Sequence, residues 1–164
     1  MSSATSATQA IHDIAISEHG AAILQRARAT ADIDSGYAGG VTPGEAWQLF
    51  SNGDAVLVDV RTSEERKFVG HVPDTLHVAW ATGTALTRNP RFVRELENKV
   101  KKDQIVLFLC RSGKRSAEAA KAATKGGFQN VFNVLEGFEG EIGASQQRGQ
   151  LGGWRFHQLP WVQD

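Results

Sequence analysis

The sequence predicts an α/β protein, with a doubly wound parallel sheet of about five strands, helices on both faces and an N-terminal helical extension. Short apolar, β-branched segments alternate with segments of helical spacing, and no tight hairpin turn joins consecutive strands. A length of 164 residues and a hydrophobic fraction of 41% suit one compact domain plus an extension. Ligands of such sheets bind outside the carboxyl ends of the strands, so functional residues are expected there.

The first predicted element is a helical segment from Ala10 to Ala31, which is rich in alanine and isoleucine. Its apolar face either packs against the chain's own domain or serves as a partner or dimer element. The segment from Asp32 to Gly40 contains three glycines and is typical of a linker. These features divide the chain into an N-terminal helical extension and linker, residues 1–36, and a main domain, residues 37–164.

The remaining elements follow from capping and apolar patterns. Capping boxes at Thr42–Glu45 and Thr62–Glu65 each predict the start of a helix, and the first also has proline at the first helical position. Asn89-Pro90 predicts a further helix that extends to Val100, and the alanine-rich segment Ala117–Ala123 predicts another. Apolar segments predict strands at Ala55–Val58, Leu76–Ala79, Ile105–Leu109 and Val131–Val134.

The only cysteine, Cys110, stands between the predicted strand Ile105–Leu109 and the helix that follows it. This position is the positive end of the helix dipole, where backbone N–H groups and the cations Arg111, Lys114 and Arg115 favour a thiolate. The helix end alone supplies about 0.3–1 kcal/mol at an exposed site. Ionising about half of a free thiol at pH 7 requires roughly 2 kcal/mol, so the cations must contribute. We expect an ionised, solvent-accessible nucleophile; the alternative is an inert cysteine that ends a core strand.

Residues 110–116, with the sequence Cys-Arg-Ser-Gly-Lys-Arg-Ser, resemble the active-site loop of single-domain rhodaneses, the sulfurtransferases. A second signature of that family is matched upstream by Val58-Asp59-Val60-Arg61 and Gly70-His71-Val72-Pro73. With Leu135-Glu136-Gly137, the resemblance covers about residues 41 to 138. Two spaced signatures in the right order are far more specific than the cysteine loop alone. They imply a rhodanese-like fold.

The resemblance also implies a reaction. Cys110 accepts a sulfane sulfur, becomes a persulfide and passes the sulfur to a thiophilic acceptor such as cyanide or a thiol. The substrate-binding residues implied by the loop are those that would hold a small anionic donor such as thiosulfate and the persulfide: Arg111, Ser112, Gly113, Lys114, Arg115 and Ser116. No cofactor is implied.

Three departures from the family pattern lie outside the loop. The segment Glu64–Val69 contains one more residue than the family has before its Gly-His pair. Asp74-Thr75 replaces the usual small Gly-Ala pair after Pro73, and residues 139–151 resemble an insertion. The loop is intact, but the rim of the pocket, and with it the choice of donor and acceptor, is left open.

Four further residues are expected near the site. Arg61 follows a strand end and either contacts the anion or buttresses the loop, and Asp59 is expected to be structural. His71 is expected to fix a turn, because sulfur transfer from an ionised thiol needs no base. Trp80 either forms an apolar wall over the substrate or packs in the core.

Composition excludes several other classes. The net charge of zero gives no global field for nucleic acid or membrane binding, and no apolar run approaches the ~20 residues that span a bilayer. The polar start shows no secretory signal, and no His/Cys cluster has metal-ligand spacing. A lone cysteine suits a reducing compartment, so the cytoplasm is expected. It also requires an external sulfur acceptor; the oligomeric state is left open.

Two alternatives to a sulfurtransferase remain. A phosphatase or arsenate reductase is disfavoured because Cys110 and Arg115 enclose four residues, whereas the phosphatase pattern encloses five around a larger tetrahedral oxyanion. The absence of a second cysteine also weighs against the arsenate reductase. A persulfide carrier or regulatory binding module would use the same intact loop.

Overall fold

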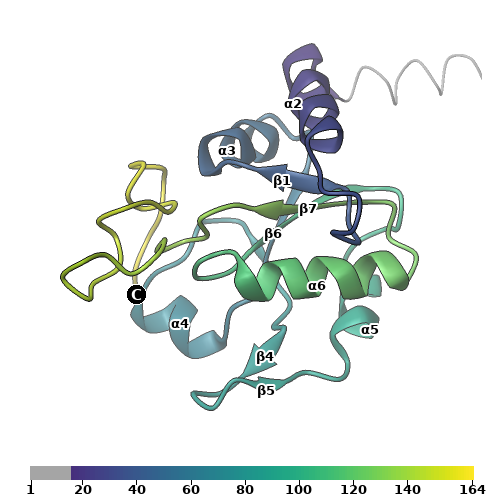
Figure 1. Cartoon of the computed structure of the whole chain (residues 1–164). Helices are drawn as coiled ribbons and strands as arrows, with labels where there is room; N and C mark the ends of the chain where they lie inside the picture. The colour runs from purple at the N-terminus through teal and green to yellow at the C-terminus, as the bar shows by residue number, and fades with distance from the viewer. Residues whose placement is uncertain (1–15) are drawn as a thin grey trace, which may run out of the picture.

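The computed structural model describes residues 16–164 (Figure 1). The helices are α2 (Glu18–Ala29), α3 (Pro43–Ser51), α4 (Ser63–Phe68), α5 (Phe92–Glu97) and α6 (Lys114–Lys125). The strands are β1 (Gly39–Val41), β2 (Val56–Asp59), β3 (Leu76–His77), β4 (Ala81–Thr82), β5 (Thr87–Arg88), β6 (Ile105–Leu109) and β7 (Asn130–Val134). Within the described residues, no helix combines the length and apolar character needed to cross a bilayer.

Five strands form one parallel sheet, which confirms the predicted parallel sheet of about five strands, and their order is β1-β7-β6-β2-β3. The chain moves outward from β2 to β3 on one side and from β6 to β7 on the other. The connections therefore change direction between the neighbouring strands β6 and β2. The carboxyl ends of these two strands flank the crevice where such sheets bind ligands. Asp59 pairs with Leu109 at this edge of the sheet.

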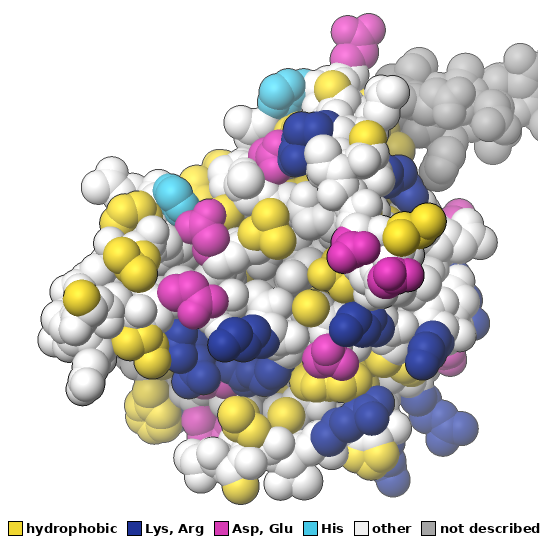
Figure 2. Space-filling view, in the orientation of Figure 1, with side chains coloured by type: hydrophobic (Ala, Val, Ile, Leu, Met, Phe, Trp, Pro, Cys, Tyr) yellow, Lys and Arg dark blue, Asp and Glu magenta, His cyan; other side chains and the backbone are white. Residues whose placement is uncertain are grey.

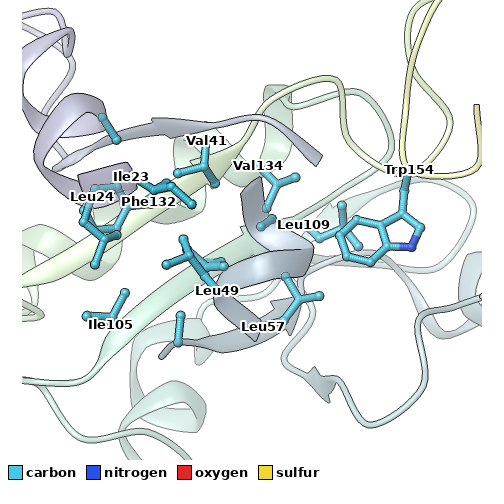
Figure 3. Packing of buried hydrophobic residues seen from close by; sticks show 14 of the residues in the cluster. Ile23, Leu24, Val41, Leu49, Leu57, Ile105, Leu109, Phe132, Val134 and Trp154 are labelled. Atoms are coloured by element: carbon cyan, nitrogen blue, oxygen red, sulfur yellow. The ribbon is translucent and has the colours of Figure 1, made fainter. Parts of the chain in front are cut away.

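The alternation of side chains along β6 divides the core into two layers. Ile105, Leu107 and Leu109 pack with residues of α2 and α3, as Figure 3 shows for part of this cluster. Val106, Phe108 and Cys110 continue the opposite face and pack with residues of α5 and α6. Figure 1 shows these two helix pairs on opposite sides of the sheet. Both faces are covered, which explains why β6 is apolar at every position.

The N-terminal helix packs against the rest of the chain. Ile23, Leu24 and Ala27 of α2 are buried in the same cluster as Val41 and Leu49. Of the predicted segment Ala10–Ala31, residues 10–15 lie outside the described part, and the helix begins at Glu18 with Ser17 as its N-cap. The described part of the extension is thus continuous with the core of the domain.

Two predictions about local structure are wrong. The predicted linker Asp32–Gly40 ends in a strand, because Gly39–Val41 pairs in parallel with β7. Two glycines among three residues hide a strand from propensity, and only the partner reveals it. A hairpin is also present: Ala81 pairs with Arg88 and Thr82 with Thr87 in an antiparallel ribbon separate from the main sheet.

The C-terminal segment closes over the carboxyl edge of the sheet. Residues 139–151, predicted as an insertion, form neither helix nor strand. Beyond them Trp154 is fully buried, its indole lies 6.2 Å from the ring of Trp47, and its Nε1 donates to the Pro160 carbonyl at 2.8 Å. The backbone of Val162 then exchanges two hydrogen bonds with His71.

This packing predicts that Trp154→Ala destabilises the protein strongly. Removing a fully buried tryptophan leaves a cavity and unpairs the Pro160 carbonyl, which costs about 3–5 kcal/mol of unfolding free energy. Urea denaturation measures the loss. Phe68→Ala, at a ring position that is 70% exposed, is the control and should change the unfolding free energy by less than about 0.5 kcal/mol. A loss of similar size in both variants would contradict the role given to Trp154.

Candidate active site

Cys110 lies directly after β6, on the face of the sheet covered by α5 and α6. The loop that follows it turns back into α6, which begins at Lys114. Gly113 adopts φ +100° at this turn, a conformation that favours glycine. Its N–H donates to the Cys110 Sγ at 3.1 Å, and Ser116 Oγ lies 3.1 Å from the same sulfur. The sulfur therefore receives a backbone N–H at a helix N-terminus, as the loop sequence predicts, and it also lies beside the Ser116 hydroxyl.

The turn after β7 fixes the direction of the loop's backbone. The Phe138 N–H donates to the Cys110 carbonyl at 2.8 Å, and the Glu139 N–H donates to the Arg111 carbonyl at 2.9 Å. Gly137 makes this approach possible, since a Cβ there would lie 2.5 Å from the Arg111 carbonyl carbon. The carbonyl groups of Cys110 and Arg111 therefore both accept hydrogen bonds from residues outside the cysteine loop.

Arg115 forms a bidentate ion pair with Glu65 on α4, with N–O distances of 2.7 and 2.8 Å. The hydrogen bonds from Glu65 raise the pKa of Arg115. Burial alone would raise the pKa of Glu65, but the hydrogen bonds and charge of Arg115 more than offset it, and that pKa is lowered. Glu65 also accepts from the Thr62 N–H in the capping box that starts α4. The sequence predicts this cap but gives Glu65 no place in the site.

Of the two roles expected for Arg61, anion contact or buttress of the loop, the contacts of its side chain favour the buttress. Arg61 and Asp59 both have 0% side-chain exposure and form an ion pair at 2.7 Å. Arg61 also donates to the Gly70 carbonyl at 2.8 Å, and its guanidinium lies 4.3 Å from the centre of the Phe138 ring. Burial alone would raise the pKa of Asp59, but Arg61 and Arg66 hold it below its usual range. Arg61 presents no surface to a donor and buttresses the turn that holds the loop.

Two other predicted residues are placed in structural settings. Trp80 is half-buried, belongs to the apolar cluster that contains Cys110, and carries the Arg88 guanidinium over its ring at 4.4 Å. His71 fixes the chain through its backbone pairing with Val162. Its side chain lines a polar hollow that also contains His77.

The sulfur is less accessible than the sequence predicts. Cys110 is 1% exposed, because the Gly113 N–H and Ser116 close around Sγ and the apolar cluster packs behind it. Burial alone would fit the alternative given above, an inert cysteine at the end of a core strand. The Gly113 N–H aimed at the sulfur does not, since a core cysteine packed as a small hydrophobe needs no such donor.

Two cations of the loop are left uncompensated within the described residues. Arg111 is half-buried, and its Nε is buried without a hydrogen-bond partner. Lys114 is exposed, and neither residue is among those that form ion pairs in the part of the chain described. Figure 2 shows Lys and Arg side chains gathered on the face that carries α6. Ser112, also half-buried, completes the loop.

The structure adds two residues that the sequence analysis missed. Glu65 compensates Arg115, and Asn133 on β7 accepts a hydrogen bond from Ser116 and donates one to the Gly113 carbonyl. Asn133 was detectable only as a polar residue in an apolar strand, where it is 4% exposed. No group of three or more His, Cys, Asp or Glu side chains among residues 16–164 could hold a metal ion.

Fold and site together define an α/β protein whose single cysteine is held in a six-residue loop at the N-terminus of a helix. The chain belongs to the rhodanese family, since the model of the Rhodanese-like domain matches residues 42–141. An uncharacterized protein from Rickettsia rickettsii is 38% identical over 118 residues, which cover 69% of this chain and 87% of that protein. The thiosulfate sulfurtransferase GlpE from Coxiella burnetii is 30% identical over 95 residues, covering 58% of this chain and 78% of GlpE.

Solved structures share the fold of this chain. Rv0390 from M. tuberculosis matches with a TM-score of 0.70 and 46% identity, covering 78% of this chain and 99% of that one. The Rhodanese-like domain of an Anabaena protein matches with a TM-score of 0.56 at 12% identity, covering 76% of this chain and 79% of that one, which supports the fold alone.

The Arg115–Glu65 pair predicts a pH-dependent loss of stability in Glu65→Gln. The pair is 15% and 18% exposed, so the variant should lose about 1–3 kcal/mol of unfolding free energy at pH 7. Because the folded pKa of Glu65 is lowered, its contribution is present above the unfolded pKa and disappears as pH falls through the folded value. Urea denaturation between pH 7 and acidic pH should show the difference from wild type shrinking.

The matched control for this experiment is Glu64→Gln, which changes the exposed neighbouring carboxylate. It should alter stability by less than about 0.5 kcal/mol at either pH. A Glu65→Gln deficit that stays constant at all pH values would show that the ionised carboxylate is not what stabilises α4 against the loop.

Proposed function

We propose that this protein is a sulfurtransferase that moves a sulfane sulfur from a small anionic donor to a thiophilic acceptor through a Cys110 persulfide. The observation that carries the proposal is the position of the Cys110 Sγ, which receives the Gly113 N–H at 3.1 Å at the start of α6. A backbone amide at a helix N-terminus stabilises negative charge on sulfur. Membership of the rhodanese family and the similarity to GlpE, whose name specifies thiosulfate, support the same reaction.

The reaction consists of two displacements at sulfur. The Cys110 thiolate attacks the outer sulfur of thiosulfate; a bond from Sγ to that sulfur forms, the S–S bond of thiosulfate breaks, and sulfite leaves with the electron pair. Cyanide or a thiolate then attacks the outer sulfur of the persulfide. The Cys110 thiolate leaves with the bonding electrons, so the enzyme is regenerated and the sulfur departs as thiocyanate or as a new persulfide.

The surroundings of Cys110 favour a small donor that carries negative charge. The sulfur is 1% exposed, which disfavours bulky donors. Arg111 and Lys114 are the cations of the cysteine loop that form no ion pair within the described residues. Arg115 remains a proposed contact, but its charge is shared with Glu65. Cys110 is the only cysteine, so the acceptor is an external thiol or cyanide, and we place the reaction in the reducing cytoplasm.

The first test is sulfur transfer by Cys110→Ser. We expect loss of thiocyanate formation from thiosulfate and cyanide, because the serine hydroxyl is not ionised at neutral pH. Intact mass after incubation with thiosulfate should show one added sulfur in wild type, removable by cyanide and absent in the variant. Loading without turnover would favour the carrier alternative, and unchanged thiocyanate formation by Cys110→Ser would refute the proposal.

A second test concerns the donor. Arg111→Gln removes an uncompensated cation from the loop and should raise KM for thiosulfate about tenfold, with a smaller effect at high salt. Arg94→Gln makes the same change at an exposed position on α5 and is the matched control. Equal KM values for thiosulfate in the two variants would show that Arg111 does not bind the donor.

A further inference from the structure

A chain of buried hydrogen bonds connects the reactive sulfur to β7. Cys110 Sγ lies 3.1 Å from Ser116 Oγ, and that hydroxyl contacts the Asn133 Oδ1 at 2.5 Å. The Asn133 Nδ2 donates to the Gly113 carbonyl at 3.1 Å. Cys110, Ser116 and Asn133 are all at most 4% exposed, so solvent offers these groups little alternative bonding. Asn133 thus touches the loop at two points without touching the sulfur.

The direction of each bond follows from chemistry. The Gly113 carbonyl can only accept, so the NH₂ group of Asn133 must face it, and Oδ1 must face Ser116. Oδ1 can also only accept, so the single hydroxyl proton of Ser116 points toward Asn133. Ser116 then presents a lone pair to the sulfur. This arrangement is satisfied when Cys110 is a neutral thiol that donates to Ser116.

Ionisation of Cys110 leaves more hydrogen-bond acceptors around Ser116 than its hydroxyl can satisfy. The thiolate needs a donor, and Ser116 has one proton for two acceptors, Sγ and the Asn133 Oδ1. If the hydroxyl turns to the sulfur, Oδ1 loses its partner in a buried setting; if it stays, a lone pair faces the negative sulfur. Either outcome disfavours the thiolate, and both originate in Asn133.

We propose that Asn133 is a positioning residue that withholds the Ser116 hydroxyl from the Cys110 thiolate. The thiolate is then held mainly by the Gly113 N–H and the nearby cations, and it is more nucleophilic than it would be with the Ser116 hydroxyl as a second donor. In the sulfur-transfer cycle, on which this part of the inference rests, the persulfide carries its charge on the outer sulfur. Sγ then needs no donor, and the lone pair that Ser116 presents no longer faces a charged sulfur.

The charged groups around the sulfur are the same in the wild-type protein and in the variants described below. Arg115 on α6 interacts electrostatically with Cys110, with Glu65 on α4 and with Asp59 at the end of β2. Arg111 and Lys114 belong to the loop itself. All of these groups are kept in the variants below. A change in the pH at which Cys110 is alkylated is therefore caused by the Ser116 hydroxyl or the Asn133 side-chain amide.

The experiment measures the pH at which the rate of alkylation by iodoacetamide is half-maximal. Asn133→Leu keeps the shape of the side chain and removes both polar atoms, which frees Ser116 to donate to the sulfur. We expect this pH to fall by roughly one unit, a tenfold change, as the value of one hydrogen bond to a charged group implies. In a Ser116→Ala background the same substitution should have no effect, because the hydroxyl is gone.

A merely structural role gives a different result. Loss of the Asn133 bond to the Gly113 carbonyl would loosen the loop and weaken the amide contact to sulfur, which raises the pH of half-maximal alkylation in both backgrounds. A rise, or an equal shift with and without Ser116, overturns the proposal. Asn133→Ala is measured beside Asn133→Leu, so that one variant with a packing defect does not decide the outcome.

A measurement on the unsubstituted protein needs no folded variant. Because Asn133 retains the Ser116 hydroxyl, its side-chain amide resonances should show no loss of that hydrogen bond across the pH interval of alkylation. Loss of the Ser116–Asn133 hydrogen bond within that interval overturns the proposal. None of these readouts requires sulfur transfer, so an inactive protein with the expected alkylation pattern would refute the sulfurtransferase function and leave the role of Asn133 in place.

Discussion

The hydrogen bonds that hold the carbonyls of Cys110 and Arg111 to the turn after β7 determine which way the cysteine loop faces. With both carbonyls bound by the N–H groups of Phe138 and Glu139, the Gly113 N–H is left to approach the sulfur. The contact depends on Gly137, whose missing Cβ allows two backbone segments to meet. The chemistry of the loop is therefore built from main-chain groups that two different strand ends bring together.

Buried ion pairs hold the remaining elements against that turn. Arg61 joins Asp59 to the Gly70 carbonyl and lies over the ring of Phe138, while Arg115 joins α6 to Glu65 on α4. Each of these two arginines has a carboxylate partner, whereas Arg111 and Lys114 of the loop form no ion pair within the described residues. An incoming anion therefore meets the charges of Arg111 and Lys114, while the charge of Arg115 is shared with Glu65.

The sequence predicts the parts of the fold that depend on local periodicity. The bounds of β6 and the two capping boxes are confirmed, because apolar runs and Thr-x-x-Glu spacing are read within a few residues. Strand β1 is missed because its stability comes from β7, more than ninety residues later, and not from its glycines. The site shows the same limit: the cysteine loop is recognisable, but the partners Glu65 and Asn133 depend on tertiary contacts.

Burial of the Cys110 sulfur fits the proposed cycle once the two states of the sulfur are compared. At 1% exposure the free thiol is shielded from other thiols and oxidants, which matters in a chain with no second cysteine to protect it. Loading places the transferred atom one S–S bond, about 2 Å, from Sγ. The acceptor attacks this outer atom and never needs to reach Sγ. A covered cysteine is thus compatible with transfer, provided that the donor is small enough for its terminal sulfur to enter the loop.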